Sequence, residues 1–213
     1  MESLWEWFQL IKTQAQYLRW EEWVSTITQI ASVAYARKNN YLVYPTGMIG
    51  VGLAFWLYLF VASPPLYADA LLNVYYFIMS MIGWYNWTQK DDHQSNAYVI
   101  RNCTRPEWIS GGRVFVISWL IISLILHFLT DSNTPVMDGL VTGSAITAMW
   151  WMALRRVENW YMWIISNLAA IPLNLYKGFD LFAIMYVLFL YMSWNGAKEW
   201  NHLAAASKQK TDG

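Results

Sequence analysis

The residues from Asn159 to Tyr176 form a stretch without a charged side chain, with two arginines shortly before it and a lysine directly after it. As a helix, a stretch of this length is about long enough to cross the apolar part of a bilayer. It carries Trp163, Asn167 and Asn174, which a helix places on one face because of their spacing of i, i+4 and i+11. An aromatic ring and two amides at membrane depth need a partner, which is either another helix or a ligand.

The composition is typical of a membrane protein. Hydrophobic residues make up 57% of the chain and charged residues only 13%, against about 25% charged in a soluble domain. The 15 Trp and 14 Tyr residues suit membrane interfaces and stacking sites. The net charge of zero does not indicate a surface for nucleic acid. Cys103 is the only cysteine, so we expect no disulfide, and Glu2 and Glu6 stand where a cleaved signal carries basic residues.

Seven stretches are apolar enough to be interpreted as spanning helices. The first has several hydroxyl and amide side chains, so it is either a span facing a polar cavity or a small-residue helix within the bundle. Ahead of it, residues 1–21 mix aromatic and charged side chains, which predicts an amphipathic helix at the membrane surface. The longest polar loop is expected at residues 88–113. The seven predicted spans are residues 22–36, 41–62, 67–87, 114–130, 136–154, 159–176 and 180–196.

Lysine and arginine are distributed unevenly between the two ends of these spans. Counting spans along the chain places eleven of the fourteen on one side and three on the other. Because cytoplasmic loops are rich in these residues, the bias predicts an outer N-terminus and a cytoplasmic C-terminus. Residues 201–213 would then form a cytoplasmic tail.

An internal repeat is visible in two short matches. Residues 40–44 (Asn-Tyr-Leu-Val-Tyr) resemble 159–163 (Asn-Trp-Tyr-Met-Trp), and each follows a basic pair and opens a span. Residues 83–87 and 196–200 both run from a glycine to a tryptophan at the end of a third span. Two groups of three spans joined by a single crossing run parallel, and transporters with such repeats bind their solute between them near the midplane. We therefore expect a seven-helix domain at 22–200, with repeats at 22–87 and 136–200 and a linker helix at 114–130.

The sequence has none of the residue patterns of an enzyme or a metal site. Its three histidines share no ligand spacing, and there is no nucleotide-binding or serine-nucleophile motif. Acidic side chains near the predicted spans all fall at span ends, whereas coupling to protons or sodium favours one near the midplane. We expect no catalytic residue, no metal and no cofactor, and passive rather than ion-coupled transport.

Polar and aromatic side chains at midplane depth are the candidates for a binding site. On the span 67–87, Asn73, Tyr76 and Ser80 share one helix face. Amides bind hydroxyl and carboxamide groups, and Trp or Tyr rings stack on a flat cation; the alternative is that the amides only bond to neighbouring helices. Tyr44 is included as the expected repeat partner of Trp163, and Trp56 as a deeper ring. The candidate substrate-binding residues are Tyr44, Trp56, Asn73, Tyr76, Ser80, Trp163, Asn167 and Asn174.

With these residues the chain resembles the PnuC family of nicotinamide riboside transporters, which is related to the SWEET sugar transporters. The resemblance implies a 3-1-3 seven-helix fold in the bacterial inner membrane and facilitated diffusion, drawn inward by a cytoplasmic kinase that phosphorylates the vitamin. It also implies that Trp163 and Asn167 bind the substrate. The segments that carry it are Tyr44-Pro45-Thr46-Gly47, Gly83-Trp84-Tyr85-Asn86-Trp87, Val157-Glu158-Asn159-Trp160, Trp163-Ile164-Ile165-Ser166-Asn167, Ile171-Pro172-Leu173 and Tyr176-Lys177-Gly178.

Three positions depart from the family pattern and leave other substrates open. The family often has Gln where this chain has Asn73, Asn where it has Ser80, and an aromatic residue where it has Asn174. Related members resemble thiamine or riboflavin carriers, so nicotinamide riboside is the first expectation and another flat vitamin the second. A structural membrane protein without a solute is the alternative from another class. The expected partners are the vitamin and membrane lipid, with no nucleic acid, and a homo-oligomer is left open.

Overall fold

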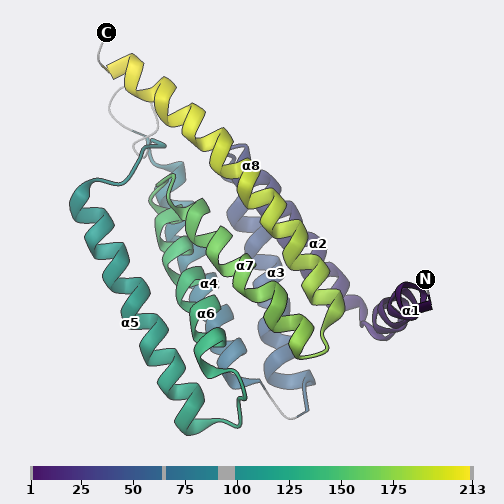
Figure 1. The fold of residues 1–213 in the computed structure, drawn as a ribbon. Helices are drawn as coiled ribbons and strands as arrows, with labels where there is room; N and C mark the ends of the chain where they lie inside the picture. The colour runs from purple at the N-terminus through teal and green to yellow at the C-terminus, as the bar shows by residue number, and fades with distance from the viewer. Residues whose placement is uncertain (1, 64–65, 91–98, 212–213) are drawn as a thin grey trace.

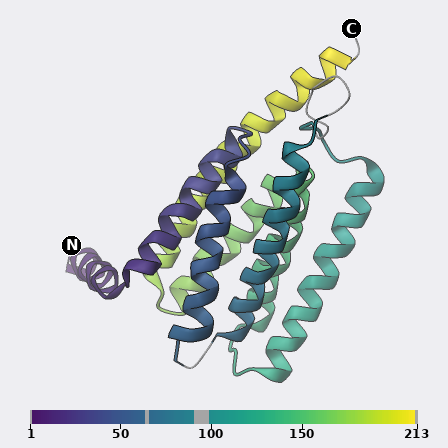
Figure 2. The same ribbon diagram turned by 180° about the vertical axis from the view of Figure 1, so that it is seen from behind.

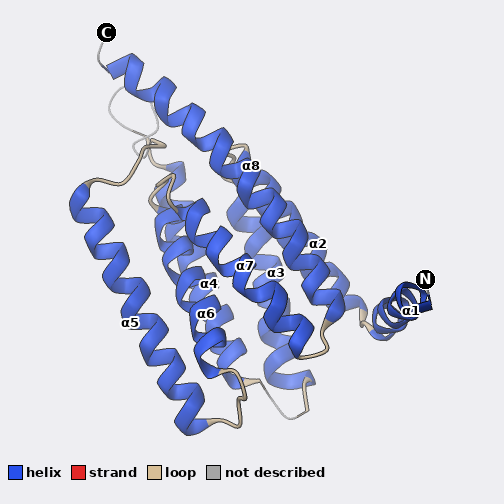
Figure 3. Cartoon of the chain, viewed as in Figure 1, coloured by secondary structure: helices blue, strands red, loops and turns tan. Residues whose placement is uncertain are grey.

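A computed structural model describes residues 2–63, 66–90 and 99–211, and within these ranges the chain is helical and has no β-strand (Figure 3). The predicted all-α class is thereby confirmed. The elements are α1 (Glu2–Tyr17), α2 (Trp20–Arg37), α3 (Val43–Trp56), the π-helix η1 (Leu57–Val61), α4 (Tyr67–Thr88), α5 (Arg105–Leu129), α6 (Pro135–Ala153), α7 (Asn159–Tyr176) and α8 (Asp180–Thr211).

Six of the helices form a closed ring. Consecutive helices pack along α2–α3–α4 and along α6–α7–α8, and the ring closes where α4 meets α6 and α8 meets α2. α5 lies outside the ring against α6 (Figures 1 and 2). The helix α1 projects sideways at the end opposite the C-terminus (Figure 1). It is held there by a hydrogen bond from Trp7 Nε1 to Asp180 Oδ1, at 2.8 Å.

The outer helix α5 has the character of a lipid-facing span. Among the described residues, only α5 and the continuous helical segment Val43–Val61 are both long enough and apolar enough to cross a bilayer. None of the residues in the most apolar stretch of α5 is buried. Its exposed side chains include Ile117, Leu120, Ile121 and Leu124, which is the surface that a lipid environment requires.

Two glycines of α6 let α5 approach closely. Gly139 and Gly143 are spaced four apart, and a Cβ at Gly139 would lie 2.2 Å from Ser123 Oγ. A Cβ at Gly143 would lie 2.9 Å from the backbone N of Trp119. Small residues at this spacing are a common way for membrane helices to bring their backbones together.

Two helices are longer than the predicted spans. α5 begins at Arg105 rather than 114, because Thr104 caps it and Glu107 accepts the Thr104 backbone N–H at 2.8 Å. α8 continues to Thr211, so the expected tail is helical as far as the structure describes it. The polar loop after α4 is correspondingly shorter than residues 88–113.

Candidate functional site

One end of the ring is closed by two tryptophans that make matching contacts. Trp87 near the end of α4 donates its indole N–H to the carbonyl of Met152 in α6, at 3.1 Å. Trp200 of α8 donates in the same way to Ala36 of α2, at 3.0 Å. Each carbonyl belongs to the last turn of its helix, and the two indole rings lie 5.7 Å apart. Each group of three helices is thus bonded to the other at this end.

A second matching pair of rings packs beneath the tryptophans. Tyr44 of α3 sits on Gly83, where a Cβ would come within 2.3 Å of the ring. Trp160 of α7 sits on Gly196, where a Cβ would come within 2.7 Å. Trp160 meets Trp200 edge-on at 5.6 Å, as Tyr44 meets Trp87 at 5.1 Å. We call Tyr44, Trp87, Trp160 and Trp200 the aromatic cluster; all four are at most 2% exposed.

These contacts make Trp160 the counterpart of Tyr44, where the sequence had suggested Trp163. The turns before the two helices agree with this register. Asn39 has φ 52° two residues after α2 ends, and Arg155 has φ 55° two residues after α6 ends. Matching the two left-handed residues aligns Tyr44 with Trp160. The short sequence match was therefore displaced by three residues, close to one helical turn.

Ionic contacts fasten the first turn of α5 and the segment before it to the turn between α6 and α7. Glu107 is bound by Arg101 and by Arg156, each at 2.8 Å. Arg101 also shares backbone hydrogen bonds with this turn, donating to the carbonyl of Arg155 and accepting from the N–H of Val157. The guanidinium of Arg155 lies 4.5 Å from the centre of the Trp87 ring, close enough for a cation–π contact with the aromatic cluster.

The lone cysteine belongs to the same structural joint. The backbone N–H of Cys103 donates to Glu158 Oε2 at 2.8 Å. Burial, together with the neighbouring Glu158 carboxylate, raises the pKa of the Cys103 thiol well above its usual range. A thiol held in its neutral form is a poor nucleophile.

Trp163 and Asn167 of α7 face two other helices. The Trp163 ring lies 6.4 Å from that of Tyr76 in α4. Its indole Nε1 is buried and has no hydrogen-bond partner among the described residues. Asn167 donates Nδ2 to Ser193 Oγ of α8 at 3.2 Å, and both are at most 4% exposed. The structure thereby gathers aromatic, amide and hydroxyl groups of α4, α7 and α8.

The remaining candidates on α4 and α7 are placed less uniformly. Ser80 and Asn73 are buried, and Asn73 Nδ2 bonds to the Asp69 carbonyl of its own helix at 2.8 Å. Asn174 Nδ2 likewise bonds to the Ala170 carbonyl of its own helix at 2.8 Å. Neither amide donates across helices through these bonds.

Two aromatic candidates are not brought to Trp163. Trp56 is 51% exposed and packs on Phe60, 4.7 Å away. Tyr44 belongs to the aromatic cluster, and its hydroxyl donates to the Met152 carbonyl at 3.4 Å.

Ser193 is the residue that the sequence reasoning missed. It stands three residues before Gly196, as Ser80 stands three residues before Gly83. The match of 83–87 with 196–200, carried one turn back, would have paired the two serines.

The arrangement supports binding rather than bond chemistry. Among the described residues, no three His, Cys, Asp or Glu side chains are placed to hold a metal ion. His93, considered at the sequence level, lies outside the described residues. A ring pair, a buried indole N–H, an amide and hydroxyls are groups that orient a flat polar solute.

Comparison with known proteins yields consistent matches. A sequence model of the family described as nicotinamide mononucleotide transporter matches residues 19–202. The nicotinamide riboside transporter PnuC of Escherichia coli is 26% identical over 207 residues, covering 86% of this chain and 85% of that protein. The riboflavin/roseoflavin transporter RibM of Streptomyces davaonensis is 21% identical over 190 residues, covering 87% and 86%. A crystal structure of the vitamin B3 transporter PnuC matches with a TM-score of 0.71 at 24% identity, covering 93% of this chain and 90% of that one.

Proposed function

The chain belongs to the nicotinamide mononucleotide transporter family, and we propose that it carries nicotinamide riboside across the bacterial inner membrane by facilitated diffusion. The observation that carries the proposal is the buried, unpaired indole N–H of Trp163, beside the Tyr76 ring and the Asn167 amide. A nicotinamide ring is a flat cation that would stack between aromatic faces. Its carboxamide and ribose hydroxyls would use the buried amide and serine groups.

The finer architecture is a 3-1-3 arrangement of seven spans. α2–α4 and α6–α8 would be the two repeats and α5 the linker, with α1 as an amphipathic helix on the membrane surface. The reciprocal bonds of Trp87 and Trp200 support this pairing, as does the matched packing on Gly83 and Gly196. We retain the predicted repeat boundaries of 22–87 and 136–200, which lie within α2–α4 and α6–α8.

The substrate would lie between the repeats. Trp163 and Tyr76 would supply ring faces, and Asn167, Asn73 and Ser80 polar contacts, with Asn174 one turn or so farther along α7. We leave Trp56 out of the site because its ring faces outward. We assign Tyr44 to closure of the pathway, since opening this end of the ring requires Trp87 and Trp200 to release their carbonyls.

Orientation follows from charge. The ends of α2, α4, α6 and α8 and the starts of α5 and α7 lie at one end of the bundle (Figure 1). The Lys and Arg residues concentrate there, so we assign this end and the C-terminus to the cytoplasm and the N-terminus to the outside. A cytoplasmic kinase would then trap the vitamin after entry.

Uptake of labelled nicotinamide riboside into vesicles tests the site. Trp163→Ala should raise the substrate concentration for half-maximal uptake about tenfold, because a buried cation–π contact is worth roughly 1–2 kcal/mol. Asn167→Ala should raise it by a similar factor. Trp84→Ala is the matched control, since Trp84 is 41% exposed on α4. If saturable uptake is unchanged in both Trp163→Ala and Asn167→Ala, these two residues do not bind the substrate.

The same assay ranks substrates and tests passive transport. The riboflavin transporter among the relatives makes riboflavin the first competitor to try and thiamine the second. If riboflavin or thiamine inhibits uptake more strongly than unlabelled nicotinamide riboside does, that vitamin becomes the assigned substrate. Loss of initial uptake on adding an uncoupler, in vesicles without a trapping kinase, would contradict facilitated diffusion.

A further inference from the structure

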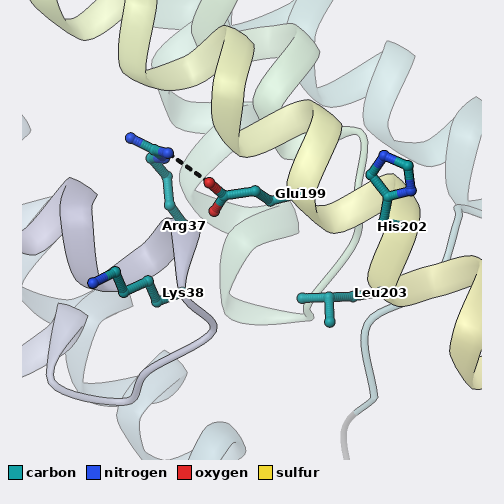
Figure 4. Close-up of a pocket in the computed structure, with 5 residues that line it drawn as sticks. All are labelled: Arg37, Lys38, Glu199, His202 and Leu203. Atoms are coloured by element: carbon teal, nitrogen blue, oxygen red, sulfur yellow. Dashed lines mark hydrogen bonds and ion pairs between the residues drawn. The ribbon is translucent and has the colours of Figure 1, made fainter.

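Two hollows meet at the end of α8 that we assign to the cytoplasm. One, of about 370 Å³, is lined by Arg37, Lys38, Glu199, His202 and Leu203 (Figure 4). The other, of about 510 Å³, runs between α7 and α8 and is lined by Tyr161, Ile164, Ile165, Trp194, Ala197, Lys198, Asn201 and His202. His202 lines both, so the two hollows adjoin at this side chain, and together they reach from the end of α2 across α8 to α7.

The upper part of this surface is cationic. Arg37 bonds to Glu199 at 2.5 Å (Figure 4), which leaves Lys38 as a positive charge on the same hollow. Lys198 adds a second, with its Nζ 5.7 Å from the centre of the Trp194 ring. His202 lines both hollows, and its imidazole can donate a hydrogen bond. Lys38, Lys198 and His202 are all exposed, so none of the three side chains is fixed by burial.

The lower part of the surface is apolar and faces away from the substrate site. Ile165 and Trp194 are 40% and 57% exposed, on the outside of the α7–α8 pair. Tyr161 accepts a hydrogen bond from Asn201 at 3.1 Å, so its hydroxyl is held at the polar rim. Trp and Tyr at such a rim mark the depth of lipid headgroups.

We propose that this surface binds an anionic phospholipid of the cytoplasmic leaflet. Lys38, Lys198 and His202 hold the phosphate, and an acyl chain lies in the groove along Ile164, Ile165 and Ala197. Basic pockets between membrane helices on the cytoplasmic side are suited to such headgroups. A free phosphate would leave the apolar groove unused, which is why the lipid is the occupant.

The site has a mechanical consequence for the transporter. Lys38 follows α2 directly, and His202 lies two residues after Trp200, which bonds to Ala36 of α2. A lipid held by both helices therefore bridges the contact that closes this end of the ring. This role is independent of which vitamin is carried.

Lipid titration of the delipidated, full-length protein in detergent tests the proposal. Dissociation constants for phosphatidylglycerol and phosphatidylcholine with the same acyl chains are measured by native mass spectrometry. We expect tighter binding of phosphatidylglycerol, and about a fivefold loss in Lys198→Gln and again in Lys38→Gln. Arg113→Gln is the control, because Arg113 is an exposed cation on α5 and should leave the preference unchanged.

Three outcomes would overturn the site. Equal affinity for the two lipids, or equal losses in Arg113→Gln, would mean that no defined site exists. Displacement of phosphatidylglycerol by millimolar inorganic phosphate alone would assign the cations to a soluble anion. A change of oligomeric state in Trp194→Gln, with lipid preference intact, would assign the groove to a second copy of the chain. Uptake of nicotinamide riboside is scored separately, so the lipid site and the transported substrate can fail independently.

Discussion

The two groups of three helices, α2–α4 and α6–α8, are alike where the ring closes and different where the candidate site lies. At the closed end, each group contributes one tryptophan, one glycine on which an aromatic ring packs, and one backbone carbonyl that accepts the indole N–H of the other group. In the register set by these contacts, Trp163 and Asn167 of α7 correspond to Gly47 and Val51 of α3. Closure is therefore shared equally, whereas of the two middle helices only α7 carries candidate binding groups at these positions.

Packing explains why α3 has no counterpart of Trp163. A Cβ at Gly47 would lie 3.0 Å from Ser32 Oγ of α2, and Ser32 donates to the Val43 carbonyl at 2.7 Å. α2 and α3 are thus packed too closely at this level for a large ring. The ring next to Trp163 in the candidate site comes instead from Tyr76 on α4.

Enlarging the two glycines under the aromatic cluster should give the largest effect. Gly83→Leu and Gly196→Leu each force a buried ring out of place, because a Cβ already meets Tyr44 at 2.3 Å and Trp160 at 2.7 Å. Overpacking of this kind costs about 1–3 kcal/mol. We expect both variants to lower the thermal unfolding midpoint in detergent by similar amounts.

Gly112→Leu is the control for these substitutions. Nothing lies within 4 Å of a Cβ at Gly112 on α5, so this change should raise helix propensity without a clash. A large loss for one glycine of the cluster and none for the other would break the equivalence of the two groups.

The two serines in matching positions, Ser80 and Ser193, should act differently on uptake. Ser193 accepts the Asn167 amide at 3.2 Å, so we expect Ser193 to position that side chain and Ser80 to contact the solute directly. Each alanine variant should raise the substrate concentration for half-maximal uptake about fivefold, as the loss of one hydrogen bond of about 1 kcal/mol predicts. In an Asn167→Ala background the Ser193→Ala effect should vanish and the Ser80→Ala effect should persist. Full additivity for Ser193 would show that it does not act through Asn167.

Much of the fold was predictable because membrane helices are marked by charge. The stretch 159–176 coincides with α7, since the arginines before it and the lysine after it bound an uncharged run. The late start expected for α5 overlooked the capping box of Thr104 and Glu107, a local signal that was present in the sequence.

The sequence could nominate candidate site residues only where one helix face is distinct. Trp163 and Asn167 stand out because α7 has few other polar groups. The exposure of Trp56 was not predictable, because α3 is apolar on all sides and its sequence pattern does not say which face is buried. The partner of Asn167 depends on the packing of α8 against α7, and no spacing within α7 contains that information.

The smallest expected effect is a difference within the aromatic cluster. Trp87→Leu and Trp200→Leu each leave one helix-end carbonyl without its indole donor, which costs about 1 kcal/mol in both cases. Trp87 also has the Arg155 guanidinium over its ring at 4.5 Å, a contact worth roughly 0.5–1 kcal/mol more. Trp87→Leu should therefore lower the unfolding midpoint further than Trp200→Leu, and the gap should close when both are made in Arg155→Gln. An equal midpoint in the two single variants would mean that the cation adds nothing, and that closure is as symmetric in energy as it is in its two indole hydrogen bonds.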